Sequence, residues 1–531
     1  MARLAAIDIG SNAMRLRIVD VDPPDQGPRG PRFRAFREVC AERIPVRLGH
    51  DVFTKGRIEP SMIAQACDAL RRFRSTMDSV KVDRYRAVAT SASREAKNGD
   101  VFVERAEREA GVHVEVIEGV EEARLVQAAV RERLNLDGRL AVLVDIGGGS
   151  TELTLLKDQA AVFARSLPVG TVRLVEAFLE GGGLVDGVRA QLLEEYVERI
   201  CAEPLRELLA IAGGPIDMIV ATGGNIETIA ELCPMPLAFP ETRAVEVTSM
   251  RKLVAELSGL TLEERCLRHG LRPDRADTIV PASHILLRVA DALGARELLS
   301  PGVGLKEGVL VDLAVEHFLP RDFSGEAASV TDACVRLGRR YHFDEEHGRV
   351  VATFALQLFD DLGALHGLGP RDRILLLAAA LLHDIGDFVR YEGHHKHSFY
   401  IIAHSDVMGV TPSERSIVAN VARYHRKSPP SVEHENFRDL AREDRIKVKM
   451  MASILRLADA LDREHRRVVS GVRARVSGDT LWLDVEGTEA RALEEWTVRA
   501  KSGLLRETLG LEVRFEDPVV LRSSVTPPSA R

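Results

Sequence analysis

The sequence contains one short unit twice, as Ala6-Ile7-Asp8-Ile9-Gly10 and as Leu143-Val144-Asp145-Ile146-Gly147. In each copy a run of apolar residues, typical of a buried strand, reaches an aspartate and then a glycine turn that leads into a returning strand. The copies are separated by the length of a whole domain, which argues against a solenoid. We therefore expect two similar α/β lobes, each built around one such strand and turn.

The rest of the chain changes character twice. A third glycine turn, Thr222-Gly223-Gly224-Asn225, follows an expected strand, the pattern becomes helical and histidine-rich beyond Pro320, and strands return from Gly471. We expect lobes over 1–128 and 129–318, a helical domain over 319–466 and a small α+β domain over 467–531. The last domain is expected to pack against the helices or to support a dimer, and its Ser/Pro-rich end after Val520 to be disordered.

Composition describes a globular protein of 531 residues with 45% apolar and 29% charged residues. The formal net charge of -8 provides no overall attraction for polyanions, so such a substrate must be met by local basic residues, and nucleic acid is not expected as a partner. The six cysteines are scattered, and the longest apolar run is too short to span a bilayer. These features predict reduced thiols and a cytoplasmic location.

The glycine turns predict phosphate binding. Glycine lets several backbone N–H groups approach one anion closely, and Ser11, Ser150 and Thr151 add hydroxyl donors. A carboxylate beside such a loop would repel phosphate directly, so Asp8, Asp145 and Glu152 are expected to act through Mg²⁺ or a water. A single such hairpin is usually a structural turn, whereas two copies in matched contexts favour a functional site.

These residues carry a family resemblance. Asp-Ile-Gly-Ser-Asn (8–12) and Asp-Ile-Gly-Gly-Gly-Ser-Thr-Glu (145–152) resemble the two phosphate motifs of the exopolyphosphatase / guanosine pentaphosphate phosphohydrolase family. Further segments match in order: 89–98, 119–124, Thr222-Gly223-Gly224 and 304–308. The resemblance covers essentially the whole chain. It implies duplicated actin-like (ribonuclease H-like) lobes, an all-α HD-like domain and a homodimer.

The resemblance also implies roles for individual residues. Glu121 is the expected general base, Arg94 the phosphate clamp, and Asp145 and Glu152 the Mg²⁺-side carboxylates with Asp8 close by. The remaining phosphate contacts are expected from Gly10, Ser11, Asn12, Gly147, Gly148, Gly149, Ser150, Thr151, Gly223 and Lys306. Three departures from the family pattern are Ala13 in place of a frequent serine, Ser93 in place of an aliphatic residue, and Lys306 in place of the common arginine.

The helical domain contains a second candidate site. His383-Asp384 ends an apolar run and resembles the paired ligands of HD-domain phosphohydrolases, which implies this ligand set: His347, His383, Asp384, His397, His425 and Asp459. Imidazoles and carboxylates suit Mn²⁺, Fe²⁺ or Mg²⁺. Some family members have lost this metal set and use the domain to extend the substrate channel. A bound metal, a second hydrolytic site and a polyphosphate path along the nearby basic stretches 394–397 and 423–427 all stay open.

The leading hypothesis is an exopolyphosphatase, a phosphoric anhydride hydrolase that uses Mg²⁺ to release orthophosphate from the end of inorganic polyphosphate. An equally compatible activity is 5′-phosphohydrolysis of guanosine pentaphosphate (pppGpp). A third hypothesis is an HD-type phosphohydrolase with a degenerate actin-like half, and a fourth is a non-enzymatic sensor of polyphosphate or nucleotide. The intact carboxylates argue against a sensor, and the helical domain argues against a sugar kinase or heat-shock ATPase.

Overall fold

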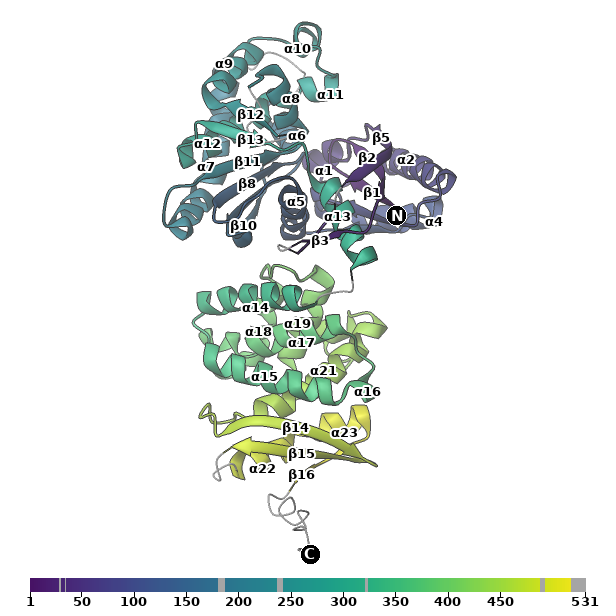
Figure 1. The fold of residues 1–531 in the computed structure, drawn as a ribbon, viewed down its shortest axis with the longest axis vertical. Helices are drawn as coiled ribbons and strands as arrows, with labels where there is room; N and C mark the ends of the chain where they lie inside the picture. The colour runs from purple at the N-terminus through teal and green to yellow at the C-terminus, as the bar shows by residue number, and fades with distance from the viewer. Residues whose placement is uncertain are drawn as a thin grey trace, which may run out of the picture. The chain divides into compact units, whose positions relative to one another are not determined.

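The computed structural model describes residues 1–27, 30–33, 35–179, 187–235, 242–319, 323–487 and 492–516 (Figure 1). The chain forms two compact units, Met1–Arg321 and Asp322–Arg531. The four domains expected from the sequence are thus grouped two by two. The chain end after Val520, expected to be disordered, lies outside the described residues. No helix among the described residues is long and apolar enough to cross a membrane.

The first unit contains two sheets that share the order of their first five strands. The first sheet is ordered β5-β2-β1-β6-β7 and the second β10-β9-β8-β11-β13-β12. In each sheet the first three strands form an antiparallel meander, and two more strands add in parallel, β6 and β7 in the first sheet and β11 and β13 in the second. The second sheet has one further strand, β12, which pairs antiparallel with β13 at its edge. The strands are β1 (Ala2–Ile9), β2 (Met14–Val21), β5 (Phe36–Ile44), β6 (Arg84–Ala89), β7 (Val114–Val116), β8 (Leu140–Ile146), β9 (Thr151–Lys157), β10 (Ala160–Leu167), β11 (Met218–Thr222), β12 (Arg243–Glu246) and β13 (Glu297–Ser300). The shared topology supports the two related lobes expected from the repeat.

Both central strands are buried on their two faces, which explains why they read as continuous apolar runs. On one face Leu4 and Leu143 share a core that lies between the sheets. On the other faces, Ile7 packs under helices of the first lobe and Val144 under helices of the second. The helices of this unit are α1 (Leu48–Lys55), α2 (Pro60–Ser79), α3 (Ser91–Glu95), α4 (Gly99–Ala110), α5 (Gly119–Arg133), α6 (Thr171–Phe178), α7 (Gly187–Ala212), α8 (Gly224–Leu232), α9 (Val247–Ser258), α10 (Leu262–His269), α11 (Pro273–Ala276), α12 (Ile279–Leu293) and α13 (Leu305–Phe318). The strands β3 (Asp25–Gly27) and β4 (Gly30–Arg32) form a small antiparallel hairpin.

Helices α5 and α13 are exchanged between the lobes. Helix α5 follows the last strand of the first sheet but packs on β9 and β10, whereas α13 follows β13 and packs on β1. The two helices cross at Gly308, where an added Cβ would lie 2.0 Å from the carbonyl oxygen of Leu125. The expected lobe boundary at 128 therefore falls inside α5, and the segment 129–318 gives its last helix to the first sheet.

The second unit begins with helices and ends with a three-stranded sheet. Its helices up to residue 460 are α14 (Phe323–Arg340), α15 (Glu345–Asp361), α16 (Gly363–His366), α17 (Pro370–Leu382), the short 3₁₀ helix η1 (Ile385–Phe388), α18 (His394–Ala403), α19 (Pro412–Arg423), α20 (Glu435–Arg438) and α21 (Arg442–Ala460). The remaining elements are β14 (Val469–Ser477), β15 (Thr480–Gly487), α22 (Ala492–Lys501), α23 (Gly503–Leu509) and β16 (Glu512–Phe515).

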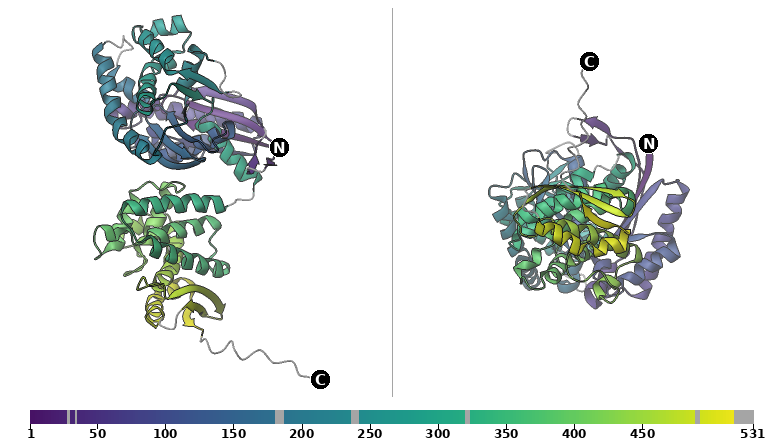
Figure 2. Two further views of the ribbon diagram at one scale, coloured as in Figure 1. Left: turned by 60° about the vertical axis from the view of Figure 1, so that its left-hand side comes forward. Right: turned by 90° about the horizontal axis from the view of Figure 1, so that it is seen from below.

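The helices and the small sheet of the second unit share one hydrophobic core. Leu455 of α21, Leu481 of β15 and Leu505 of α23 belong to it. Figure 2 shows β14 and β15 beside the helices, and β14 contacts α15 while α22 and α23 contact α21. The domain boundary expected at residue 466 therefore does not separate two hydrophobic cores. The C-terminal segment packs against the helices, which is one of the two roles expected for it.

Candidate active site

The two glycine turns are closed by equivalent backbone hydrogen bonds. Gly10 N–H donates to the Ala13 carbonyl at 3.2 Å, and Gly147 N–H donates to the Ser150 carbonyl at 3.0 Å. The strand register then places Asp8 opposite Arg15 and Asp145 opposite Glu152. The duplicated turns therefore differ in charge, because one aspartate faces a cation and the other faces a second carboxylate.

The turns pack directly against each other. A Cβ on Gly148 would lie 2.7 Å from the Cβ of Ser11, and one on Gly149 would lie 2.2 Å from the ring of Phe53. A Cβ on Gly170, just before α6, would meet the backbone of Gly149 at 2.5 Å. Gly148 and Gly149 therefore allow the close approach of the two lobes, and Gly170 allows the start of α6 to approach the second turn.

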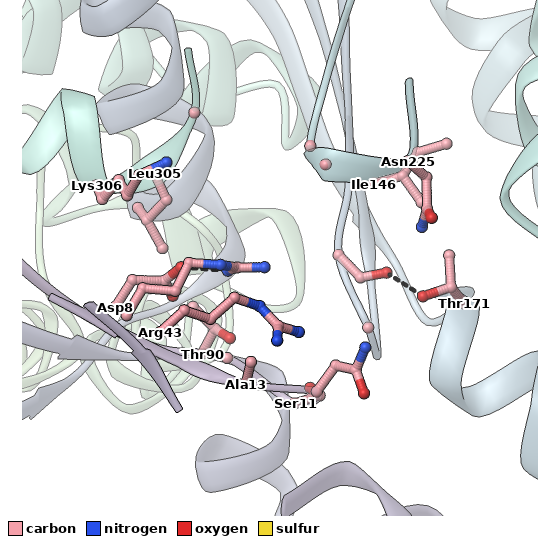
Figure 3. Close-up of a pocket in the computed structure, with 18 of the residues that line it drawn as sticks. Asp8, Ser11, Ala13, Arg43, Thr90, Ile146, Thr171, Asn225, Leu305 and Lys306 are labelled. Atoms are coloured by element: carbon pink, nitrogen blue, oxygen red, sulfur yellow. Dashed lines mark hydrogen bonds and ion pairs between the residues drawn. The ribbon is translucent and has the colours of Figure 1, made fainter. Parts of the chain in front are cut away.

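A cavity of about 350 Å³ opens where the turns meet. Figure 3 shows Asp8 and Arg43 on one side of it and Thr171 and Asn225 on the other. The residues of the sequence-derived site that line the cavity are Asp8, Gly10, Ser11, Asn12, Asp145, Gly147, Gly148, Gly223 and Lys306. The two motifs and the third glycine turn therefore meet at one site.

Cations from distant parts of the chain also line this cavity: Arg15, Arg43, Arg272, Arg275 and Lys306. Arg275 donates to Asn225 Oδ1 at 2.9 Å, while its buried Nε has no hydrogen-bond partner among the described residues. Burial, followed by repulsion from Arg15, lowers the pKa of Arg275 to about 10. A buried guanidinium with unfilled donors beside other cations favours binding of an anion.

Three carboxylates gather at the other side of the turns. One oxygen each of Glu122, Asp145 and Glu152 lies within 4.8 Å of the other two. Thr222 Oγ1 donates to Asp145 at 2.5 Å and Ser166 Oγ donates to Glu152 at 2.7 Å. The Oε2 atoms of both glutamates have no hydrogen-bond partner among the described residues.

This carboxylate cluster is electrostatically unfavourable when all its members are ionised. Burial raises the pKa of Asp145 to about 6 and, together with the charge of Asp145, that of Glu152 to about 7. Burial and the charge of Glu152 raise the pKa of Glu122 well above its ordinary value. Such a set is satisfied by bound protons or by a divalent cation with oxygen ligands.

The structure does not bring Glu121, the base expected from the sequence, into this cavity. Its carboxylate pairs with Arg124 at 2.7 Å and with Arg86 at 3.2 Å, beside Asp312 of α13. The neighbouring Glu122 lines the cavity instead and is buried. Successive side chains on a helix point about 100° apart, so α5 can direct only one of the two inward.

Several other expected residues support the cavity from behind. Arg94 lies outside the lining, donates to the Ile117 carbonyl at 2.6 Å and lowers the pKa of Glu122 by its charge. Gly149, Ser150, Thr151 and Glu152 also lie outside the lining, and Thr151 donates to the Val169 carbonyl at 2.6 Å. Asp8 lines the cavity, but its Oδ2 accepts a bond from Arg15 at 2.6 Å and the metal-competent grouping has Glu122 in its place.

The second unit brings together most of the expected second ligand set. His347, His383 and Asp459 form one group, and Asp384 and His425 form another with His394. His397 is partly exposed and belongs to neither group among the described residues. The expectation of His397 is wrong because α18 begins at His394 and directs that residue inward three positions earlier.

Sequence reasoning missed the cationic lining and the true inward glutamate. Arg15 had a usable signal, since the hairpin register predicts a residue opposite Asp8. Arg43, Arg272 and Arg275 had none, because no local motif surrounds them and only the tertiary fold brings them to the turns. Glu122 lies within the matching segment 119–124, but the family resemblance assigned the general base to the neighbouring Glu121.

Paired glycine turns on two related sheets, with arginines and carboxylates around one cavity, define a two-lobed protein of the phosphate-handling class. The sequence signature of the Ppx/GppA phosphatase family matches residues 31–317, and that of Ppx/GppA phosphatase domain III matches residues 331–508. The chain belongs to this family. The family assignment makes it a hydrolase that acts on phosphoric anhydrides.

Named relatives are of two kinds. The guanosine-5′-triphosphate,3′-diphosphate pyrophosphatase of Aeromonas salmonicida is 27% identical to this chain, and the match covers 78% of this chain and 79% of that protein. The pyrophosphatase of the same name from Vibrio parahaemolyticus is 25% identical, and the match covers 92% of this chain and 94% of that protein. The crystal structure of an exopolyphosphatase from Cytophaga hutchinsonii is 25% identical, with a TM-score of 0.52, and covers 59% of this chain and 98% of that one.

Proposed function

We propose that the first unit hydrolyses the terminal phosphate of inorganic polyphosphate and releases orthophosphate. The observation that carries this proposal is a cavity lined by arginines and by Glu122 and Asp145, with the buried Glu152 directly behind these two carboxylates. A phosphate chain needs several cations along its length and a base beside its last phosphorus. The exopolyphosphatase named above supports this substrate.

Guanosine pentaphosphate is the second candidate substrate. The relatives from Aeromonas and Vibrio are named for a guanosine polyphosphate, and their similarity extends over both units of this chain. The same arginines and carboxylates serve either substrate, because both end in a phosphoric anhydride. We expect a homodimer, as the family resemblance implies.

Asp145 and Glu152 are the proposed Mg²⁺ ligands. Their facing positions on β8 and β9, their raised pKa values and the partnerless Oε2 of Glu152 fit a hard cation that prefers oxygen ligands. Bound there, Mg²⁺ would neutralise charge on the phosphoryl oxygens. Asp8, neutralised by Arg15, is assigned to shaping the turn rather than to direct coordination.

Glu122 is the proposed general base. It lines the cavity from the first turn of α5, next to the proposed metal ligands, and can accept the proton of a water that attacks the terminal phosphorus. Turn amides and arginines hold the transferred phosphoryl group, and the leaving group is the shortened phosphate chain.

The decisive experiment measures orthophosphate release from long-chain polyphosphate, guanosine pentaphosphate and ATP at one Mg²⁺ concentration. The highest kcat/KM is expected for polyphosphate, with guanosine pentaphosphate second. A clear preference for guanosine pentaphosphate would replace the first substrate by the second. Absence of release from both would overturn the proposed function.

A further inference from the structure

The helical unit contains a buried cluster of histidines and aspartates that the first site does not use. One group joins His347, His383 and Asp459, and a second joins Asp384, His394 and His425. These residues come from α15, the end of α17, α18, the end of α19 and α21, so five separate segments converge. All four histidines are at least 98% buried.

The histidine rings are oriented so that their Nε2 atoms face one another. Nδ1 of His383 lies 2.8 Å from the Ala380 carbonyl oxygen, and Nδ1 of His425 lies 2.7 Å from that of Ala422. Because a carbonyl oxygen only accepts, the proton of each neutral ring is on Nδ1 and a lone pair is on Nε2. His347 and His394 likewise use Nδ1 toward a carboxylate, that of Asp462 at 2.8 Å and that of Asp387 at 2.6 Å. Such outer partners are those that fix metal-binding imidazoles.

The distances between these lone pairs fit metal coordination. Nε2 of His347 lies 3.3 Å from Nε2 of His383, and the same distance separates Nε2 of His394 from Nε2 of His425. Two lone pairs that face each other repel, and either a proton or a metal ion between the two nitrogens removes this repulsion. Two nitrogens that each lie about 2.1 Å from one ion, at an angle near a right angle or slightly wider, are about 3.0–3.4 Å apart.

Asp384 connects the two groups. Its Oδ2 lies 3.5 Å from His383 Nε2, while its Oδ1 lies 3.0 Å from His394 Nε2 and 3.4 Å from His425 Nε2. Oδ1 is buried and has no hydrogen-bond partner among the described residues. A carboxylate with one oxygen toward each histidine pair is placed to bridge two ions.

Asp459 completes the first group, and the C-terminal segment holds it in place. Its Oδ2 pairs with Lys501 of α22, which leaves Oδ1 facing His383 Nε2 at 3.7 Å. The side chain of Asp387 is 39% exposed and that of Asp384 18%, so the cluster is open to solvent on this side. Arg426 borders the same side, with Nη1 3.2 Å from His394 Nε2.

We propose that this cluster is a second active site, a centre of two divalent cations bridged by Asp384 that hydrolyses phosphate monoesters. A metal-activated water forms the new oxygen–phosphorus bond, the ester oxygen–phosphorus bond breaks, and the proton of the water passes to the departing alkoxide. Products are an alcohol and inorganic phosphate. Arg426 is the residue placed to bind the phosphate oxygens, and the site is independent of the anhydride hydrolysis proposed for the first unit.

The test uses the full chain with Glu122→Gln in every variant, so that the first site contributes the same low background turnover to all of them. Protein is stripped with a chelator, reloaded with Mn²⁺ and dialysed, and bound manganese is measured by elemental analysis. Hydrolysis of p-nitrophenyl phosphate is followed on the same samples. Asp384→Asn and His394→Gln change the proposed centre, and His397→Gln is the matched control on the same helix.

We expect Asp384→Asn to lower the manganese content by about two ions per chain and His394→Gln by about one. Both variants are expected to lose p-nitrophenyl phosphate hydrolysis by roughly 100-fold or more, while His397→Gln retains both. Equal manganese content in the parent and in both centre variants, each folded by thermal unfolding, would overturn the metal centre. Manganese loss without any hydrolysis by the reloaded parent would overturn the assignment as an active site.

Discussion

Glu121 and Glu122 are adjacent in the chain and yet have different surroundings. Glu121 is held by Arg124 and Arg86, whereas Glu122 is buried beside Asp145 and Glu152. The choice between them depends on the rotation of α5, which a motif of two consecutive acids does not specify. The sequence therefore predicted the segment that brings a glutamate to the cavity but not which of its two acids faces inward.

Glu122→Gln should lower phosphate release by roughly 100-fold or more, because the amide cannot accept the proton of the attacking water. Substrate affinity should change little. The matched control is Glu121→Gln, which should keep nearly full kcat. Initial rates with polyphosphate and guanosine pentaphosphate check both variants, and a larger loss in Glu121→Gln would return the base to the residue expected from the sequence.

Arg275→Gln should raise KM roughly tenfold, because a charge-assisted contact to the phosphate is lost. The melting temperature should not fall, since burial and neighbouring cations already lower the pKa of this guanidinium. Arg268→Gln, on the exposed side of α10, should leave KM unchanged. An unaltered KM in Arg275→Gln would remove this arginine from substrate binding.

Stability without Mg²⁺ should depend on pH through Glu152. Its pKa is about 7 in the folded protein against an ordinary 4.5, so the folded state keeps a proton that the unfolded chain has released. The bound proton therefore contributes fully to the free energy of unfolding below pH 4.5, and this contribution is lost as the pH rises to about 7. Its size is on the order of 3 kcal/mol.

Glu152→Gln mimics the protonated form and should remove this dependence. In chelator, thermal unfolding of the variant should match the parent at pH 5 and exceed it at pH 8. Added Mg²⁺ at pH 8 should stabilise the parent more than the variant. The same difference in melting temperature at both pH values would contradict the cause assigned to the shift.

At the scale of elements, strands with strong apolar runs could be predicted and helix ends could not. The apolar runs before the two glycine turns, expected to be buried strands, are β1 (Ala2–Ile9) and β8 (Leu140–Ile146). The segment expected to be a small α+β domain contains two helices, α22 and α23, that are separated at Ser502. A local pattern of apolar residues predicts that a strand is buried. The exchange of α5 and α13 could not be predicted in this way, because it depends on contacts between residues nearly two hundred positions apart.

Gly308→Ala should destabilise the first unit by about 2 kcal/mol, because its methyl group would overlap the backbone of Leu125 where α5 and α13 cross. The control is Gly325→Ala in α14, which has open space around it and should be neutral or slightly stabilising. Thermal unfolding followed by circular dichroism compares the two. Equal melting temperatures would show that the crossing relaxes without cost.

At the scale of the molecule, the formal charge of -8 hides a local concentration of cations. The sequence predicted that a polyanion must be met by local basic residues, and the cavity confirms a basic lining. Which residues supply it could not be predicted, because Arg15, Arg43 and Arg275 come from elements far apart in the chain. The same holds for the helical unit, where His394 replaced the expected His397.

The exchange of α5 also determines which groups move together. Glu122 is carried by a helix that rests on β9 and β10, the sheet that also carries Asp145 and Glu152. A hinge motion between the lobes would leave the base and the carboxylates as one rigid body. Only the distance from these carboxylates to Arg15 and Arg43 of the first lobe would change. Such a motion would therefore alter the contacts of the arginines with the substrate, while the positions of the base and the carboxylates relative to one another stay constant.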